Sequence, residues 1–139
     1  MEISAKSPDA FLASLPPDEK ADMELLDAEL TKRFKGRSRL LYEGRFWGGS
    51  DQSIIGYGEI SYENRSGERV NWFMVGLARQ KAYISMYVNA VGDGGYLLRA
   101  YADRLGKVKT GSASISFKSV DDVEMDTLME LVEAAAAQL

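Results

Sequence analysis

Residues 52–88 read QSIIGYGEISYENRSGERVNWFMVGLARQKAYISMYV. Three segments in this stretch, residues 52–63, 69–78 and 82–88, are rich in β-branched and aromatic residues, and polar turns separate them. In the last segment Ala82, Ile84, Met86 and Val88 alternate with Tyr83, Ser85 and Tyr87. Alternation with a period of two residues is typical of a strand with one buried face. The stretch therefore predicts an antiparallel meander of three strands.

Before the meander, the pattern predicts two helices and a strand. Ser7 and Pro8 are typical of a helix start, so we expect a short helix that ends at Pro16-Pro17. A longer helix over residues 17–35 follows, because Met23, Leu26 and Leu30 recur at three- and four-residue steps. Residues 39–43 predict a strand, and residues 47–51 predict a loop.

After the meander, the glycines of residues 92–95 predict a turn. We then expect a helix over residues 96–105, a basic loop bounded by glycines over residues 106–111, and a strand over residues 112–117. Asp121 and Glu124 resemble a capping box that opens a last helix, which runs to about residue 138.

These elements predict a fold of the α+β class, formed by a single domain over residues 1–139. We expect a curved antiparallel sheet with N-terminal, middle and C-terminal helices packed on one face.

The composition excludes several kinds of site. The chain has 139 residues and contains no Cys and no His. A disulfide framework, a Cys/His zinc site, a thiol nucleophile and an imidazole base are therefore impossible. There is no apolar run long enough to span a membrane and no signal-peptide pattern, so we expect a cytoplasmic protein that does not act at a membrane.

The formal net charge of −4 conceals a segregation of charge along the chain. Residues 1–36 and 112–139 carry net charges of −3 and −5, residues 37–69 are neutral, and residues 70–111 carry +4. This pattern indicates either complementary packing within the molecule or an anion-seeking centre between cation-seeking ends.

Three segments, taken in order, resemble one family. The first is Ser53 to Gly58 followed by Tyr62, and the second runs from Val75 through Lys81 to Tyr87. The third, the most specific, runs from Leu105 to Gly111 and on through Ile115 and Phe117 to Val123. Together they resemble the YdhG-like domain, catalogued as domain of unknown function 1801, over about residues 11–132.

The resemblance implies an α+β fold with a curved antiparallel sheet. Some members of the family are linked to iron handling because their fold resembles that of frataxin, and the family has no agreed activity. Many relatives continue the Lys-Thr-Gly segment with Lys, Ser and Cys, where this chain has Ser112, Ala113 and Ser114. This chain lacks both that basic group and that thiol, so we do not expect a role that depends on them.

The glycine-bounded basic loop is the first candidate site. Glycines let backbone N–H groups approach a ligand closely, and lysines supply positive charge. We hypothesise a site for a small anion, a phosphate or a carboxylate, formed by Arg79, Lys81, Lys107, Lys109, Thr110, Gly111 and Tyr57. The alternative is a tight turn with solvated lysines.

Two further kinds of partner come from other residues. An aromatic sheet face with basic edges could stack the bases of single-stranded nucleic acid. The aromatic residues on neighbouring predicted strands are Tyr57, Tyr62, Trp72, Tyr83 and Tyr87, but the negative net charge argues against this partner.

Clustered carboxylates can hold iron or another divalent ion without His or Cys. The candidates for that frataxin-like alternative are Asp18, Glu19, Asp22, Asp121 and Asp122, although acids in first helical turns are also favoured by the helix dipole.

Catalysis would need Tyr57, Lys107 and Lys109 to meet with shifted pKa values, and nothing in their spacing brings them together. The sequence therefore favours a binding domain without catalysis, whose ligand is an anion. The alternatives are a frataxin-like iron-binding chaperone and a protein-interaction module without a small ligand.

Overall fold

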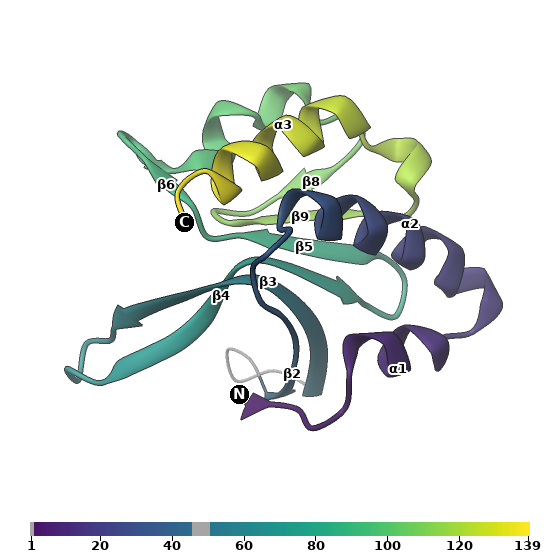
Figure 1. The fold of residues 1–139 in the computed structure, drawn as a ribbon. Helices are drawn as coiled ribbons and strands as arrows, with labels where there is room; N and C mark the ends of the chain where they lie inside the picture. The colour runs from purple at the N-terminus through teal and green to yellow at the C-terminus, as the bar shows by residue number, and fades with distance from the viewer. Residues whose placement is uncertain (1, 46–50) are drawn as a thin grey trace.

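The computed structural model describes residues 2–45 and 51–139 (Figure 1). Residues 46–50 lie outside the described residues. The predicted loop at residues 47–51 falls among them, except for Asp51, which begins a strand. The strands are β1 (Glu2–Ile3), β2 (Arg39–Arg45), β3 (Asp51–Glu63), β4 (Arg69–Arg79), β5 (Ile84–Val88), β6 (Val91–Gly92), β7 (Gly95–Tyr96), β8 (Lys109–Thr110) and β9 (Ser114–Phe117). The α-helices are α1 (Pro8–Ala13), α2 (Pro17–Arg33) and α3 (Met125–Ala136), and the 3₁₀ turns are η1 (Leu97–Ala100), η2 (Ala102–Arg104) and η3 (Val120–Asp122).

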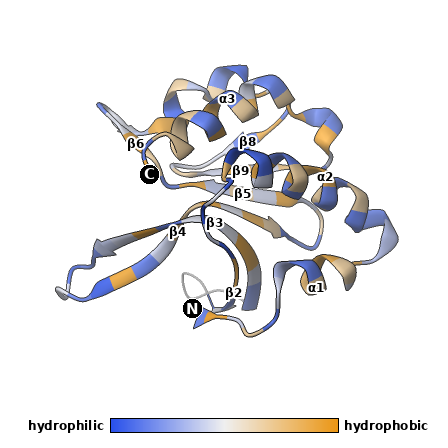
Figure 2. Cartoon of the chain, in the orientation of Figure 1, coloured by the Kyte–Doolittle hydropathy of each residue, from blue (hydrophilic) through white to orange (hydrophobic). Residues whose placement is uncertain are grey.

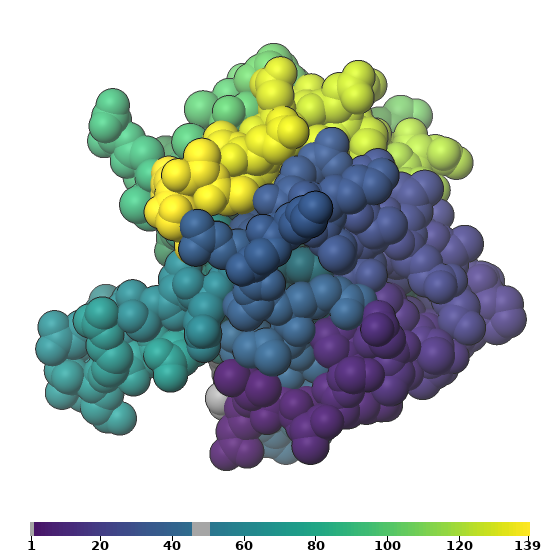
Figure 3. All heavy atoms as spheres, viewed as in Figure 1, coloured from purple at the N-terminus to yellow at the C-terminus, as the bar shows by residue number. Residues whose placement is uncertain are grey.

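Seven strands form one antiparallel sheet in the order β1-β2-β3-β4-β5-β9-β8, and β6 and β7 form a separate hairpin. Helices α2 and α3 lie side by side over one face of this sheet (Figures 1 and 3). The predicted α+β class, the three-stranded meander and the packing of helices on one face are therefore confirmed.

The strand register assigns each residue to a face. One row of paired residues crosses five strands on the helix-covered face, and each of its members is at most 1% exposed: Leu41, Ile55, Leu77, Met86 and Ile115. The adjacent row faces the other way and contains Tyr42, Ile54, Ala78, Ser85, Ser116 and Lys109. We call the side of the sheet that carries this second row the open face.

The helices complete the core. Met23, Leu26 and Leu30 of α2 and Leu128, Leu131 and Val132 of α3 are all fully buried. Hydrophilic and hydrophobic patches alternate along both helices (Figure 2), as expected for helices with one face on the core. The predicted cap of α1 is present, because the Ser7 hydroxyl accepts a hydrogen bond of 3.0 Å from the Ala10 N–H.

A partly buried polar network joins α2 to the sheet beneath it. Asp27 of α2 accepts hydrogen bonds from the Arg39 guanidinium on both carboxylate oxygens, at 3.0 and 2.8 Å, and from the Tyr57 hydroxyl at 2.6 Å. Arg39 also donates to Asp9 of α1 at 2.9 Å. Three elements far apart in sequence therefore meet at one carboxylate, which sets the position of α2 on β2 and β3.

The predicted helix at residues 96–105 is wrong. Tyr96 belongs to β7, and the next residues form the 3₁₀ turns η1 and η2. Both ends of the segment have their backbone groups engaged elsewhere, since the Leu97 N–H donates to the Ala90 carbonyl and the Leu105 carbonyl accepts from the Glu124 N–H. With Leu98 and Leu105 both buried, this tertiary packing overrides the helical pattern.

The predicted capping box at Asp121 and Glu124 is also wrong. Asp121 lies in η3, and α3 begins at Met125 after Glu124, whose side chain makes no capping hydrogen bond. Val123 between them is extended, because it forms a β-bridge with Gly106. This bridge delays the start of the helix, which ends at Ala136, two residues before the expected end.

Two glycines let aromatic rings lie flat on the open face. A Cβ atom at Gly76 would lie 2.5 Å from Cε1 of Phe73, and one at Gly56 would lie 2.5 Å from Cε1 of Tyr42. Tyr42, Ile54, Phe73 and Ala78 form a small second core here. The rings therefore cover one part of the open face and leave the rest uncovered.

This close contact gives a stability test. We expect Gly76→Ala to lower the free energy of unfolding by roughly 1–3 kcal/mol, because the added methyl group overpacks the Phe73 ring. Gly94→Ala is the matched control, since a Cβ atom there meets nothing within 4 Å. Urea unfolding of both variants measures the difference, and equal stabilities would contradict the packing described for Phe73.

Candidate functional site

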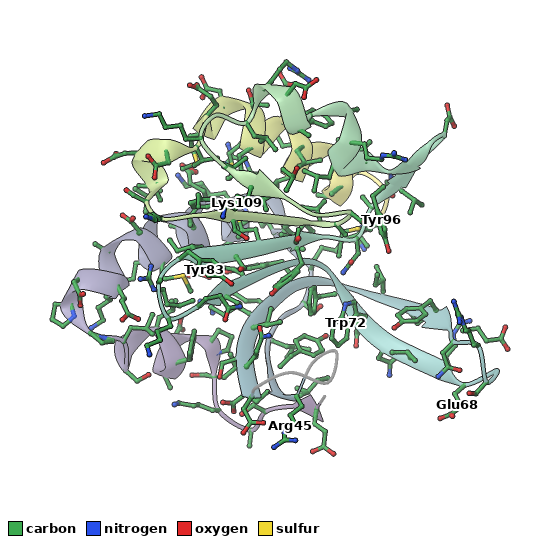
Figure 4. All side chains as sticks on the ribbon, turned by 180° about the vertical axis from the view of Figure 1, so that it is seen from behind. Arg45, Glu68, Trp72, Tyr83, Tyr96 and Lys109 are labelled. Atoms are coloured by element: carbon green, nitrogen blue, oxygen red, sulfur yellow. The ribbon has the colours of Figure 1, made fainter. Side chains whose placement is uncertain are left out.

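The open face carries two hollows, and Figure 4 labels residues that line each of them. Tyr83 and Lys109 mark the first, and Trp72 and Tyr96 mark the second. The first, which we call the lysine pocket, has a volume of about 510 Å³. It is lined by Tyr83, Lys107, Val108, Lys109, Ser116, Phe117, Lys118 and Asp122.

Strand pairing brings the lysines together from separate parts of the chain. Lys109 of β8 is paired with Ser116 of β9, and Lys118 follows Ser116 by two residues and so belongs to the same side of the chain. Tyr83 directly precedes Ile84, which is paired with Phe117. The pocket therefore forms where the ends of β5, β8 and β9 meet.

The loop that carries Lys107 is held by the backbone before α3. The Lys107 N–H donates to the Asp122 carbonyl and the Glu124 N–H donates to the Leu105 carbonyl, both at 2.8 Å. Gly106 between them has a φ of +91°, and a Cβ atom there would lie 2.6 Å from the Asp122 carbonyl oxygen. Only glycine fits this position without strain, which explains its place in the motif.

The backbone of this loop does not offer its N–H groups as we expected. The N–H groups of Lys107, Val108 and Gly111 donate to the carbonyls of Asp122, Gly106 and Ser114. The positive charge of the pocket therefore comes from side chains and not from a cradle of backbone donors.

The charges of the pocket are not neutralised by ion pairs. Within the described residues, no carboxylate oxygen lies within 4.0 Å of the ammonium group of Lys107, Lys109 or Lys118. All three lysines are exposed, and Asp122 is the one acidic residue among those that line the pocket. Three cations and one carboxylate leave a formal charge of +2 around this hollow.

Arg79 and Lys81, which the sequence assigned to the same site, do not line this pocket. Arg79 is paired with Ile84 and shares its helix-covered face, where its Nε lies 3.4 Å from Oε1 of Glu19. Lys81 is exposed in the turn between β4 and β5. Thr110 and Gly111 line a different hollow of about 540 Å³, together with Gly95, Tyr96, Leu98, Arg99, Ala102 and Ser112.

Tyr57 lies on the opposite face from the lysines. It is fully buried under α2 and donates its hydroxyl proton to Asp27. Burial raises the pKa of Tyr57 well above its ordinary value, and the charge of Asp27 and the hydrogen bond to it raise the pKa further. Tyr57 is therefore a structural residue, and it cannot meet Lys107 or Lys109 for acid–base chemistry.

The five carboxylates proposed for iron do not form a metal centre. Glu19 is paired with Arg79, and Asp22 accepts a hydrogen bond of 3.2 Å from the Val120 N–H. Asp18 and Asp121 are exposed, while Asp122 lines the lysine pocket. Across residues 2–45 and 51–139, no group of three or more acidic side chains is placed to hold a metal ion. The residues present therefore do not fit an iron site.

The second hollow, which we call the aromatic groove, has a volume of about 780 Å³. One wall comes from the β3–β4 hairpin and the other from the β6–β7 hairpin, and these two hairpins project on the same side of the molecule (Figures 1 and 3). The lining residues are Arg45, Ile60, Tyr62, Trp72, Phe73, Tyr87, Asn89, Val91, Tyr96, Ala113 and Ser114.

The aromatic residues singled out from the sequence divide between the faces. Tyr62, Trp72 and Tyr87 line the groove, Tyr83 lines the lysine pocket, and Tyr57 faces the helices. Sequence reasoning missed Lys118 and Ser116. Alternation along the strand could have placed both residues on the open face, because Ser116 and Lys118 alternate with Ile115 and Phe117, which the pattern assigned to the core.

Comparisons with known proteins add no further assignment. No family model, curated protein or solved structure gives a significant match to this chain. The resemblance to the YdhG-like domain therefore stays a prediction. In the described part of the chain, none of the helices has the length and apolar character needed to cross a membrane.

The burial of Tyr57 predicts a loss of stability at high pH. The folded protein holds the Tyr57 proton more tightly than the unfolded chain, whose tyrosines have a pKa of about 10. Below pH 10 both states keep the proton and the contribution of Tyr57 is fully present. Above pH 10 only the unfolded state loses the proton, so stability falls by about 1.4 kcal/mol per pH unit for this group.

Tyr57→Phe removes this contribution while Tyr42 and Tyr87, whose pKa values are also raised by burial, keep theirs. We expect urea unfolding between pH 10 and pH 11 to show a shallower decline for the variant than for the parent protein. Parallel declines would show that Tyr57 is not held in its protonated form by folding.

Proposed function

We propose that this chain is a binding domain that takes an anionic ligand, a phosphate or a carboxylate, in the lysine pocket. One observation carries the proposal: strand pairing gathers Lys107, Lys109 and Lys118 around one hollow, and no ion pair among the described residues neutralises them. The ammonium groups repel one another. An anion bound among them is attracted to each one, and this attraction offsets the repulsion.

The chemistry of the pocket suits binding without reaction. Tyr83 adds a hydroxyl group and Ser116 a second one, and both can donate a hydrogen bond to an oxyanion. Tyr57, the third member of the acid–base set considered from the sequence, lies on the other face of the sheet. The binding role therefore needs fewer assumptions than a catalytic one.

The position of the pocket sets the expected strength of binding. The lysines are exposed to solvent, where a pair of unit charges 4 Å apart is worth about 1 kcal/mol. Three such contacts imply weak to moderate affinity that falls as salt is added. The alternative of a protein-interaction module stays a prediction, since an acidic protein surface would use the same cations.

Calorimetric titration with inorganic phosphate at low ionic strength tests the proposal. We expect Lys107→Ala and Lys109→Ala each to weaken phosphate binding by about fivefold, because each removes one charge contact. Lys35→Ala is the matched control, since Lys35 is an exposed lysine just after α2 and does not line the pocket.

The double variant Lys107→Ala/Lys109→Ala should lose most of the measurable binding, and added sodium chloride should weaken the parent protein's binding. Equal affinities of the double variant and Lys35→Ala would overturn the proposal, as would an absence of phosphate binding by the parent protein.

A further inference from the structure

We propose that the ligand is an organic anion with a flat aromatic group, which lies in the aromatic groove while the anionic group occupies the lysine pocket. This inference rests on the proposed function, because it places one end of the ligand in the same pocket. It adds the chemical class of the rest of the ligand.

The two hollows are neighbours on one surface. Ser114 lines the groove and Ser116 lines the pocket, and they are successive residues on the open face of β9. The rise of a strand places them roughly 7 Å apart. Across from them on β5, Tyr87 is paired with Ser114 and Ser85 with Ser116.

The strand between the hollows carries small polar side chains. Ser114 and Ser116 of β9 are both half-buried, and their hydroxyl groups can hydrogen-bond to the part of a ligand that joins its two ends. A single ligand can therefore reach from the groove into the pocket along β9.

The groove has the chemistry of a site for aromatic rings. Trp72 and Phe73 are stacked with ring centroids 4.5 Å apart, and Tyr62 and Tyr96 on opposite walls are 47% and 40% exposed. A flat group placed between these walls would bury tyrosine surface that now contacts water, with a gain from ring contacts in addition.

Charge decides which end of the ligand goes where. Of the described residues that line the groove, none is acidic, and Arg45 is the one that carries a charge. The Arg45 guanidinium Nε lies 3.7 Å from the Asp51 carboxylate, which offsets part of that charge. The anionic group therefore goes to the three lysines, and the uncharged group goes to the groove.

The same charges argue for a small ligand over a nucleic acid strand. Glu63 and Glu68 flank the turn of the β3–β4 hairpin, whose tip is marked by Glu68 in Figure 4, and Asp93 lies in the turn of the β6–β7 hairpin. Arg65 and Arg69 of the β3–β4 hairpin balance its two glutamates, so a polyanion that left the groove along this hairpin would find no net positive charge to hold it. A ligand with one anionic end needs only the three lysines.

A series of phenylalkyl phosphates with one, three and five methylene groups tests the inference, with inorganic phosphate as the reference. We expect affinity to rise along the series, to about tenfold above inorganic phosphate once the ring reaches the groove. Tyr62→Ala and Tyr96→Ala should remove most of this gain and leave the affinity for inorganic phosphate unchanged.

Leu25→Ala is the matched control, because Leu25 is 45% exposed but lies on α2, away from both hollows. It should change neither affinity. Lys107→Ala/Lys109→Ala should weaken every member of the series, inorganic phosphate included.

The outcomes separate this inference from the proposed function. If inorganic phosphate binds and the phenyl group adds nothing, or adds a gain that Tyr62→Ala and Tyr96→Ala retain, this inference is wrong while the proposed function stands. If inorganic phosphate does not bind, the proposed function fails. Tighter binding of a thymidine octanucleotide than of any phenylalkyl phosphate, lost in the same variants, would overturn the inference in favour of nucleic acid.

Discussion

The register of the antiparallel sheet is the constraint on which the rest of the structure depends. Because side chains alternate between faces, the buried row from Leu41 to Ile115 cannot slip by one residue without exposing all of its members. The burial of that row against α2 and α3 therefore also determines what faces the other way. The open face, with Ser85, Ser116 and Lys109, is a consequence of this choice.

Two local devices secure this arrangement. Asp27 accepts hydrogen bonds from Arg39 and Tyr57, so the position of α2 over the sheet is set by directional bonds as well as by apolar packing. On the other side, Gly56 and Gly76 let Tyr42 and Phe73 lie against the strands. The aromatic rings then form one end of the open face, and the lysines form the other.

Local pattern was sufficient to predict most of the regular structure. The alternation of Ile84, Met86 and Val88 with Tyr83, Ser85 and Tyr87 placed each residue on the correct face, and the periodicity of Met23, Leu26 and Leu30 identified the buried side of α2. Where tertiary contacts determine the backbone, the pattern failed. The β-bridge between Gly106 and Val123 ends the 3₁₀ segment and delays the start of α3. Nothing in the local sequence around either residue indicates that the two will pair.

The candidate site could be predicted only in part. Lys107 and Lys109 were found because they are close in sequence, but the third lysine, Lys118, joins them through the pairing of β8 with β9. Arg79 and Tyr57 were assigned to the same site, yet their parity places them on the helix-covered face, where Glu19 and Asp27 hold them. Parity within a strand shows which residues share a face, but which residues meet around one pocket depends on strand pairing, and the sequence of one strand does not contain that pairing.

Everything proposed for this protein requires that ligands bind on the open face of the sheet. Backbone amide chemical-shift mapping during titration with 3-phenylpropyl phosphate measures where they bind. We expect shifts concentrated at residues 107–109, 114–118 and 83–87, with smaller changes at Tyr62 and Tyr96. Shifts concentrated instead in α1, α2 or α3, or spread evenly over the chain, would contradict binding on the open face.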